Sequence, residues 1–236
     1  MKCRWFALRA AKTWRHADEN SMDRVIAVLF LVLTLVFSVS SQIELRPDLK
    51  SAADLAQFAL DGSGEWKIVD GRLILSKAGV PAGPIRRPAA LAILKGTPFS
   101  QVQVDLDLRS LAGQDVPRRD LDLVFGYQSP KRFYYAHLSA VTDNVHNGVF
   151  LVDNSDRRRI DDGKGIPRLV DQKWHHVRLK WNSSTGQSFV YFDSSPEPIL
   201  SASDRSLTFG LIGFGSFDDM GEFRNIQVKG SRATPR

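Results

Sequence analysis

Short segments that alternate apolar and polar residues recur along most of this chain, and they restrict its fold more than any other feature. The clearest is Gln101–Leu108 (QVQVDLDL), which places Val102, Val104, Leu106 and Leu108 on one face of a strand. Similar segments alternate with turn residues roughly every eight to twelve positions, and none of useful length has the helical period. The pattern predicts an all-β sandwich or barrel. Because the strands differ in length and several connections are long, we favour a two-sheet antiparallel jelly-roll sandwich.

The predicted strands are either alternating or continuously apolar, and turn residues bound them. They are Glu65–Val69, Arg72–Leu75, Ala89–Leu94, Gln101–Leu108, Leu121–Tyr127, Phe133–Leu138, Gly148–Val152, Trp174–Trp181, Ser188–Asp193, Leu207–Phe217 and Phe223–Val228, with a short strand near Ile160. Asp70-Gly71 is a strong signal for a hairpin turn. The segment from Lys77 to Pro88, both included, contains three prolines and two glycines, which indicate a loop.

The amino-terminal residues 1–41 read as a leader. An apolar run at 25–39 is short for a membrane span and typical of the hydrophobic region of a signal peptide. Small residues at 38–41 provide a cleavage point before Gln42, and translation from Met22 would give the short flank that such peptides have. We therefore expect a secreted or periplasmic protein. The alternative is anchorage to the membrane by an uncleaved segment at 25–41.

The remaining residues divide into a polar connecting segment (42–57), one sandwich domain (58–230) and a flexible tail (231–236). The formal charge is +6, but beyond residue 41 there are 26 Lys and Arg against 23 Asp and Glu, which leaves +3. Nucleic-acid binding usually needs a concentrated basic face, so we do not expect it here. Cys3 is the only cysteine, which excludes an intramolecular disulfide.

Three motifs carry a resemblance to a known family. These are WKIVDGRL at Trp66–Leu73, WHHVRL at Trp174–Leu179 and GLIGFGSFDDMGEFRNIQV at Gly210–Val228. In this order they resemble concanavalin A-like lectin/glucanase domains, and more narrowly the laminin-G-like and 3-keto-disaccharide-hydrolase-like group of secreted bacterial domains. The resemblance covers roughly Phe58 to Lys229. It implies a jelly roll of two curved sheets, with ligands met on the concave face or at loops along its rim.

One departure from the family bears on catalysis. The glucanase branch carries a Glu-x-Asp-x-x-Glu arrangement, and no Glu after Ser41 has a carboxylate partner at that spacing. Two strands each place a pair of carboxylates on one face, Asp105 with Asp107 and Asp120 with Asp122. Such pairs could flank a glycosidic bond. More often they are the solvated face of an amphipathic strand, which is the interpretation that we favour.

The stretch from Asp120 to Val152 holds the densest group of polar and aromatic side chains. Tyr135 and His137 share one strand face, and a polar loop follows them. The predicted ligand-binding residues are Tyr135, His137, Asp143, Asn144, His146 and Asn147. Aromatic rings stack on sugar rings, and polar neighbours can hold the hydroxyls. The alternatives are a core tyrosine and histidine at Tyr135 and His137, and capping or turn roles for the loop residues.

Weaker candidates exist for catalysis and for a metal. His137 and Asp143 are the catalytic candidates. Asp218 and Asp219 precede the last strand in a glycine-containing turn, and they are the candidates for a structural calcium site. Two adjacent aspartates need further ligands to make such a site, so a turn role is the alternative.

The function that the sequence favours is therefore binding of a carbohydrate or glycoconjugate by a secreted, non-catalytic β-sandwich. The alternatives are a glycoside hydrolase or lyase of the 3-keto-disaccharide hydrolase-like type and a laminin-G-like module that binds another protein. The missing paired-Glu motif favours binding. The His, Asp and Asn side chains between Tyr135 and Asn147 keep catalysis open.

Overall fold

The computed structural model describes residues 42–80, 83–113 and 115–233. The expected leader, with its apolar run at 25–39 and the start at Met22, lies outside these residues. Within the described ranges, no helix is both long enough and apolar enough to cross a membrane. The same ranges contain fifteen strands and one 3₁₀ helix, η1 (Ala52–Gln57). The all-β class predicted from the alternating segments is confirmed.

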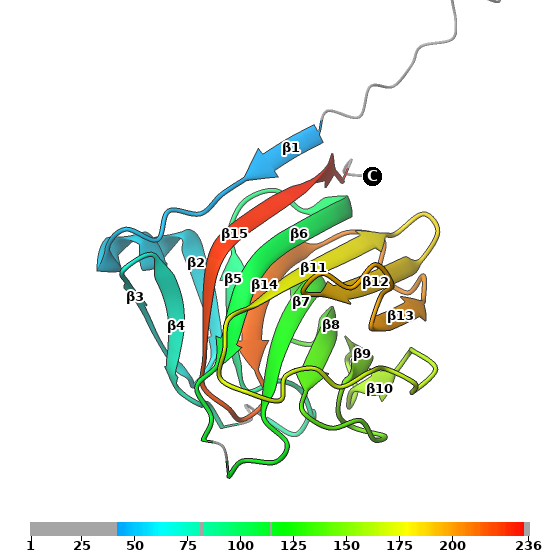
Figure 1. The fold of residues 1–236 in the computed structure, drawn as a ribbon. Helices are drawn as coiled ribbons and strands as arrows, with labels where there is room; N and C mark the ends of the chain where they lie inside the picture. The colour runs from blue at the N-terminus through cyan, green and yellow to red at the C-terminus, as the bar shows by residue number, and fades with distance from the viewer. Residues whose placement is uncertain (1–41, 81–82, 114, 234–236) are drawn as a thin grey trace, which may run out of the picture. The chain divides into compact units, whose positions relative to one another are not determined.

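The strands form two antiparallel sheets, A and B (Figure 1). Sheet A has the order β13-β12-β11-β6-β15-β4-β3, and β1 pairs with β15. Its strands are β1 (Gln42–Leu45), β3 (Glu65–Val69), β4 (Arg72–Lys77), β6 (Phe99–Ser110), β11 (His175–Asn182), β12 (Gln187–Phe192), β13 (Leu200–Ser203) and β15 (Gly221–Arg232). Neighbours such as β6 and β15 lie far apart in the sequence, so pairing between distant segments defines this sheet.

Sheet B has the order β10-β9-β8-β7-β14-β5-β2. Its strands are β2 (Phe58–Gly62), β5 (Ala90–Leu94), β7 (Asp120–Ser129), β8 (Arg132–Ser139), β9 (Gly148–Asp153), β10 (Arg158–Arg159) and β14 (Leu211–Ser216). The three strands predicted within Asp120–Val152 are thus consecutive neighbours in this sheet. The strand expected near Ile160 is β10, which ends one residue earlier.

The main core lies between the two sheets. Val104 and Leu106 of β6 and Leu123 of β7 are among its fully buried residues, as the alternation along Gln101–Leu108 predicts. The hairpin expected at Asp70-Gly71 is also present. Both residues have positive φ (51° and 75°), the backbone that a tight two-residue hairpin requires and that Gly adopts without strain.

A second apolar cluster lies on the other face of sheet B. It contains Leu91, Ile93, Val124, Phe133, Tyr135, Phe150 and Val152, and these residues alternate along their strands with residues of the main core. Ile85, from the loop between β4 and β5, packs against the cluster. That loop is joined to the turn after β9, because Arg86 N donates to Asp156 Oδ1 (2.8 Å) and Arg157 N donates to Arg86 O (3.0 Å). Both faces of sheet B are therefore covered.

Several boundaries differ from the expectation, and the strand expected over Leu207–Phe217 is the shorter β14 (Leu211–Ser216). Gln42–Leu45, which we expected within a connecting segment, pairs with residues 228–231 as strand β1. The last strand runs to Arg232 instead of ending at Val228. Residues 228–231 pair with β1 on one side and with β6 on the other, so strand pairing satisfies the backbone hydrogen bonds of both segments.

Candidate functional site

The structure buries the two residues at the centre of the predicted site. Tyr135 and His137 are 0% and 1% exposed, so they have the core roles that were the alternative to ligand binding. Tyr135 belongs to the second apolar cluster, and its hydroxyl accepts a hydrogen bond from Arg157 (2.9 Å). The guanidinium of Arg157 also lies over the ring of Phe217, 4.1 Å from the ring centroid. Arg157, from the loop after β9, thus covers the outer face of sheet B at Tyr135, and the local sequence around Tyr135 does not indicate this contact.

The loop between β8 and β9 holds the other predicted residues. Asp143 and Asn144 are exposed and His146 is half-buried. Asp143 accepts hydrogen bonds from the backbone N–H of Val145 and of His146 and contacts the His146 ring at 2.8 Å. Asn147 is fully buried with a positive φ of 48°. Its amide donates to Thr142 Oγ1, so Asn147 has the structural role that was the alternative for it.

Arg159 holds this loop in place from β10. Its guanidinium donates to the backbone carbonyls of Asp143, His146 and Asn147 and forms an ion pair with Asp161 (2.8 Å). The exposed part of the predicted site therefore has a defined backbone. A ligand-binding role for Asp143, Asn144 and His146 stays a prediction.

Behind that loop lies a buried cluster of two carboxylates and one imidazole, formed by Asp120, Asp122 and His137. Asp122 and His137 are directly opposite each other on β7 and β8, and His137 Nδ1 is 2.8 Å from Asp122 Oδ1. Asp120, two positions earlier on the same face of β7, lies 3.7 Å from the same nitrogen. The solvated-face interpretation of Asp120 and Asp122 is therefore wrong, because they are 1% and 0% exposed.

Burial dominates the electrostatics of this cluster. It raises the pKa of Asp120 and of Asp122 well above the ordinary range, and it lowers the pKa of His137 to about 4. Each group is thus pushed toward its neutral form. Asp122 Oδ2 and His137 Nε2 are buried and have no hydrogen-bond partner among the described residues. Unsatisfied buried polar atoms are uncommon, and such atoms often mark the place of a water or an ion.

The turn between β14 and β15 extends the cluster toward the surface. Asp219 Oδ2 accepts a hydrogen bond from Asp120 N (2.8 Å), and Asp120 Oδ2 accepts one from Phe217 N (2.8 Å). Asp120, Asp218 and Asp219 each offer an oxygen within 4.8 Å of the others. Asp218 is exposed and Asp219 is half-buried. The two predicted metal candidates thus have a third carboxylate beside them, which the sequence spacing did not reveal.

A second candidate site is a groove of about 450 Å³ on the outer face of sheet A, which we call the sheet A groove. Amides, hydroxyls and lysines are prominent in its lining, which consists of Gln42, Gln101, Val102, Gln103, Lys180, Trp181, Asn182, Thr185, Gln187, Phe189, Lys229, Gly230 and Ser231. Its volume is within the range typical of small-molecule sites. The lining includes no Asp or Glu.

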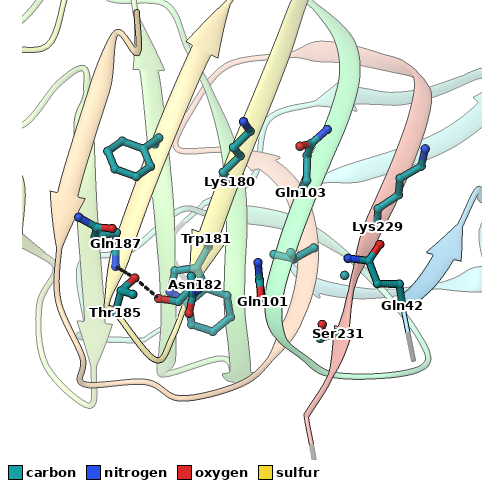
Figure 2. A pocket seen from close by; sticks show the side chains of 13 residues that line it. Gln42, Gln101, Gln103, Lys180, Trp181, Asn182, Thr185, Gln187, Lys229 and Ser231 are labelled. Carbon is teal, nitrogen blue, oxygen red and sulfur yellow. Dashed lines mark hydrogen bonds between the residues drawn. The ribbon is translucent and has the colours of Figure 1, made fainter. Parts of the chain in front are cut away.

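Strand register explains why these side chains meet. Gln103 on β6 is directly opposite Lys180 on β11 and Lys229 on β15. Two residues earlier on β6, Gln101 is directly opposite Asn182 on β11 and Ser231 on β15. Figure 2 shows Lys180, Gln103 and Lys229 projecting to the same side from three adjacent strands. With about 4.8 Å between strands, the polar rows of the groove extend across the sheet.

Farther along the same face, the carboxylate pair of β6 is held in ion pairs. Asp105 binds Arg178 (2.6 Å) and Asp107 binds Arg224 (3.3 Å), and His176 lies within 3.4 Å of both carboxylates. Asp105 and Asp107 thus lie on the outer face of sheet A, as the solvated-face interpretation expects, but their side chains are only 13% and 20% exposed because their ion-pair partners cover them. The alternation along Gln101–Leu108 indicates this polar face of β6 but not the groove, because the other rows of the groove come from strands that pair only in the folded protein.

Comparisons with known proteins give structural matches alone. No family model matches the chain, and no curated protein matches it. The carbohydrate-binding module CBM66 from Bacillus subtilis is similar, with 17% identity over 72% of this chain and 94% of that protein and a TM-score of 0.52. Winged bean acidic lectin, in a complex with methyl-α-D-galactose, has 11% identity over 82% of this chain and all of the lectin (TM-score 0.51).

A sialidase is also similar, with 13% identity and a TM-score of 0.51 over 81% of this chain but only 18% of the larger protein. At these identities the matches establish the fold and no more. They agree with the two antiparallel sheets and with the resemblance in the three sequence motifs. The protein therefore has the concanavalin A-like β-sandwich fold.

Proposed function

We propose that this protein is an exported, non-catalytic carbohydrate-binding β-sandwich and that the sheet A groove holds the glycan. The observation that carries the proposal is the composition of the groove, which amides and hydroxyls from adjacent strands line together with Phe189. Amides can donate to and accept from sugar hydroxyls, and an aromatic ring can stack on the apolar face of a pyranose. The similarity in fold to a carbohydrate-binding module and to a lectin supports this proposal.

The lining of the groove also favours binding over cleavage. Glycoside hydrolysis normally needs two carboxyl groups on either side of the scissile bond. The lining has none, and the nearby Asp105 and Asp107 already pair with Arg178 and Arg224. The groove instead carries two lysines, of which Lys229 pairs with Glu44 (3.5 Å) and Lys180 has no carboxylate partner of 4 Å or less among the described residues. Glycans with carboxylate or sulfate groups are therefore the preferred ligands, with Lys180 as the cation that binds them.

A glycan array followed by titration calorimetry tests the proposal. Phe189→Ala removes a stacking interaction of about 0.5–1.5 kcal/mol, which corresponds to affinity weakened about 2- to 12-fold. Lys180→Ala should weaken binding of acidic glycans and reduce its dependence on salt. Lys67→Ala is the matched control, because Lys67 is an exposed lysine of the same sheet on β3, outside the groove.

Two results would contradict the proposal. One is an array without a bound glycan. The other is a bound glycan whose affinity is unchanged in Phe189→Ala and Lys180→Ala, which would place its site elsewhere. Turnover of a glycoside, measured on the same samples, would move the protein to the enzyme class.

A further inference from the structure

We propose that Arg86 and Arg157, which both lie over the ring of Phe217, form a binding site for one tetrahedral oxyanion group, a sulfate or a phosphate, at the outer face of sheet B. Arg86 belongs to the loop between β4 and β5, Arg157 to the turn after β9 and Phe217 to the turn between β14 and β15. None of these residues lines the sheet A groove, so the inference is independent of the proposed glycan binding.

A single aromatic ring brings the two guanidinium groups together. The guanidinium carbon of Arg157 is 4.1 Å from the centroid of the Phe217 ring, and that of Arg86 is 5.8 Å from the same centroid. Backbone hydrogen bonds hold the two loops against each other, because Arg157 N donates to Arg86 O and Arg86 N donates to Asp156 Oδ1. Two cations are thus fixed near each other over a half-buried ring.

The guanidinium of Arg157 is held in place and still has free donors. Its Nη1 donates to the Tyr135 hydroxyl (2.9 Å), and its central carbon also lies 4.9 Å from the centroid of the Phe150 ring. Its Nε and Nη2 have no hydrogen-bond partner among the described residues, and neither is among the buried atoms that lack one. These two nitrogens therefore remain in contact with solvent, in a planar fork whose orientation is already fixed.

No carboxylate neutralises either guanidinium by direct contact. Among the described residues, Arg86 and Arg157 make no ion pair of 4 Å or less, whereas the neighbouring Arg158 pairs with Asp204 at 2.9 Å. Burial raises the pKa of Asp122 well above its ordinary range, although the charge of Arg157 acts in the opposite direction. Asp122 is thereby pushed toward its neutral form, so a bound anion would supply the charge that the two arginines lack.

Two exposed carboxylates on the same turns oppose an anion. Asp156 directly precedes Arg157, and Asp218 directly follows Phe217. Water and salt screen the charges of both, and neither pairs with one of the two guanidinium groups at 4 Å or less. Direct hydrogen bonds from a guanidinium to an oxyanion are charge-assisted and about twice as strong as neutral ones, so they outweigh this screened repulsion.

The number of available donors indicates the class of anion. Arg157 offers the N–H groups of its Nε and Nη2, and Arg86 offers its exposed guanidinium. Each guanidinium fork matches two oxygens of an anion. A carboxylate has only two oxygens, which one fork already occupies. A sulfate ester or a phosphate presents three, so it can contact both arginines at once.

An NMR titration of the arginine side-chain Nε–Hε groups in the purified protein tests the proposal. Inorganic sulfate or inorganic phosphate should shift the signals of Arg86 and Arg157 saturably, with the ionic strength held constant by sodium chloride. The anion that binds more tightly indicates whether the natural ligand carries a sulfate ester or a phosphate. Acetate, a carboxylate, should bind several-fold more weakly than the tighter of the two.

Arg86→Gln tests the exposed half of the site without disturbing the core. It removes a charged hydrogen-bond donor and should weaken binding of the tighter anion about 10-fold or more. Arg168→Gln is the matched control. Arg168 is likewise an exposed arginine of a loop, the one that precedes β11, and its substitution should leave the affinity unchanged.

Two more variants distinguish a formed site from a diffuse positive charge. Arg157→Lys keeps the charge but not the planar fork, so it should weaken binding several-fold in a protein whose unfolding curve shows that it is folded. Asp218→Asn removes a repelling charge and should bind at least as tightly as the wild-type protein.

The proposal is overturned if neither tetrahedral anion gives saturable shifts, or if acetate binds as tightly as both. It is also overturned if Arg86→Gln and Arg157→Lys bind like the wild-type protein. Weaker binding in Asp218→Asn would overturn it as well, because a cation held by that carboxylate would then carry the anion.

Discussion

The guanidinium of Arg157 donates a hydrogen bond to the hydroxyl of Tyr135 at 2.9 Å, from a loop 22 positions farther along the chain. This contact covers one end of the second apolar cluster on the outer face of sheet B. It changes the expected consequence of a substitution at Tyr135 from lost binding to lost stability.

Truncation of Tyr135 should therefore destabilise the fold. Tyr135→Ala removes a fully buried ring and should cost about 3–5 kcal/mol in the free energy of unfolding. Tyr135→Phe keeps the ring and loses the bond to Arg157, at a cost of about 1.5–3 kcal/mol, because the donor is charged. Denaturant unfolding measures both values. Equal and negligible losses would show that the outer face of sheet B opens to solvent.

Leu106 provides the corresponding test of the main core. Its side chain is 0% exposed on β6, at the centre of sheet A. Leu106→Ala should lower the free energy of unfolding by about 2–5 kcal/mol. The exposed Lys67, on the same sheet, serves as a control, and Lys67→Ala should change it by no more than about 0.5 kcal/mol. A loss as small as the control's would invert the assignment of faces on β6.

The loop after β8 should show a measurable dependence on acid. Partial burial by itself raises the pKa of Asp143, but hydrogen bonds from the N–H groups of Val145 and His146 and from the His146 ring outweigh it and lower the value to about 2. Because the folded pKa lies below the unfolded one, the contribution to stability is present above about pH 4 and is lost as the pH falls toward 2.

An NMR titration of the side-chain carboxyl carbons checks this expectation. Asp143 should titrate near pH 2 in the wild-type protein and closer to its ordinary pKa in His146→Ala, where the ring contact is gone and the backbone bonds remain. An ordinary pKa in the wild-type protein would mean that the Asp143–His146 contact does not persist in solution.

Export is a prediction from the apolar run at 25–39 and the small residues after it. We expect a mature amino terminus close to Gln42 and initiation at Met22. Amino-terminal sequencing of the native protein decides both points. A mature chain that retains residues 1–21 would contradict the start site, and an intact apolar segment in the membrane fraction would contradict cleavage.

Local sequence patterns were sufficient to predict the strands and, for many of them, which face is buried. The period-two alternation along Gln101–Leu108 predicts strand β6 and its buried side, because successive side chains of a strand point to opposite faces. The positive φ values at Asp70 and Gly71 follow from residue chemistry in the same way. These features depend on near neighbours in the chain, and the structure confirms them.

The sites depended on contacts that no local pattern contains. Tyr135 has the side chain of a sugar-stacking residue, yet Ile85 packs against its cluster and Arg157 bonds to its hydroxyl, and both come from distant loops. The sheet A groove exists because β11 and β15 pair with β6 in registers that place Lys180 and Lys229 beside Gln103.

The same reason applies to the acid cluster. The sequence shows Asp120 and Asp122 on one strand face and Asp218 and Asp219 nearly a hundred positions later, with nothing to indicate that they meet. Their approach is decided by the pairing of β14 with β7, which brings the turn before β15 to the start of β7. The sequence by itself determined the strands and the side on which each residue lies. Only the tertiary structure decided which faces are covered and which residues meet, because burial and strand pairing depend on segments far apart in the chain.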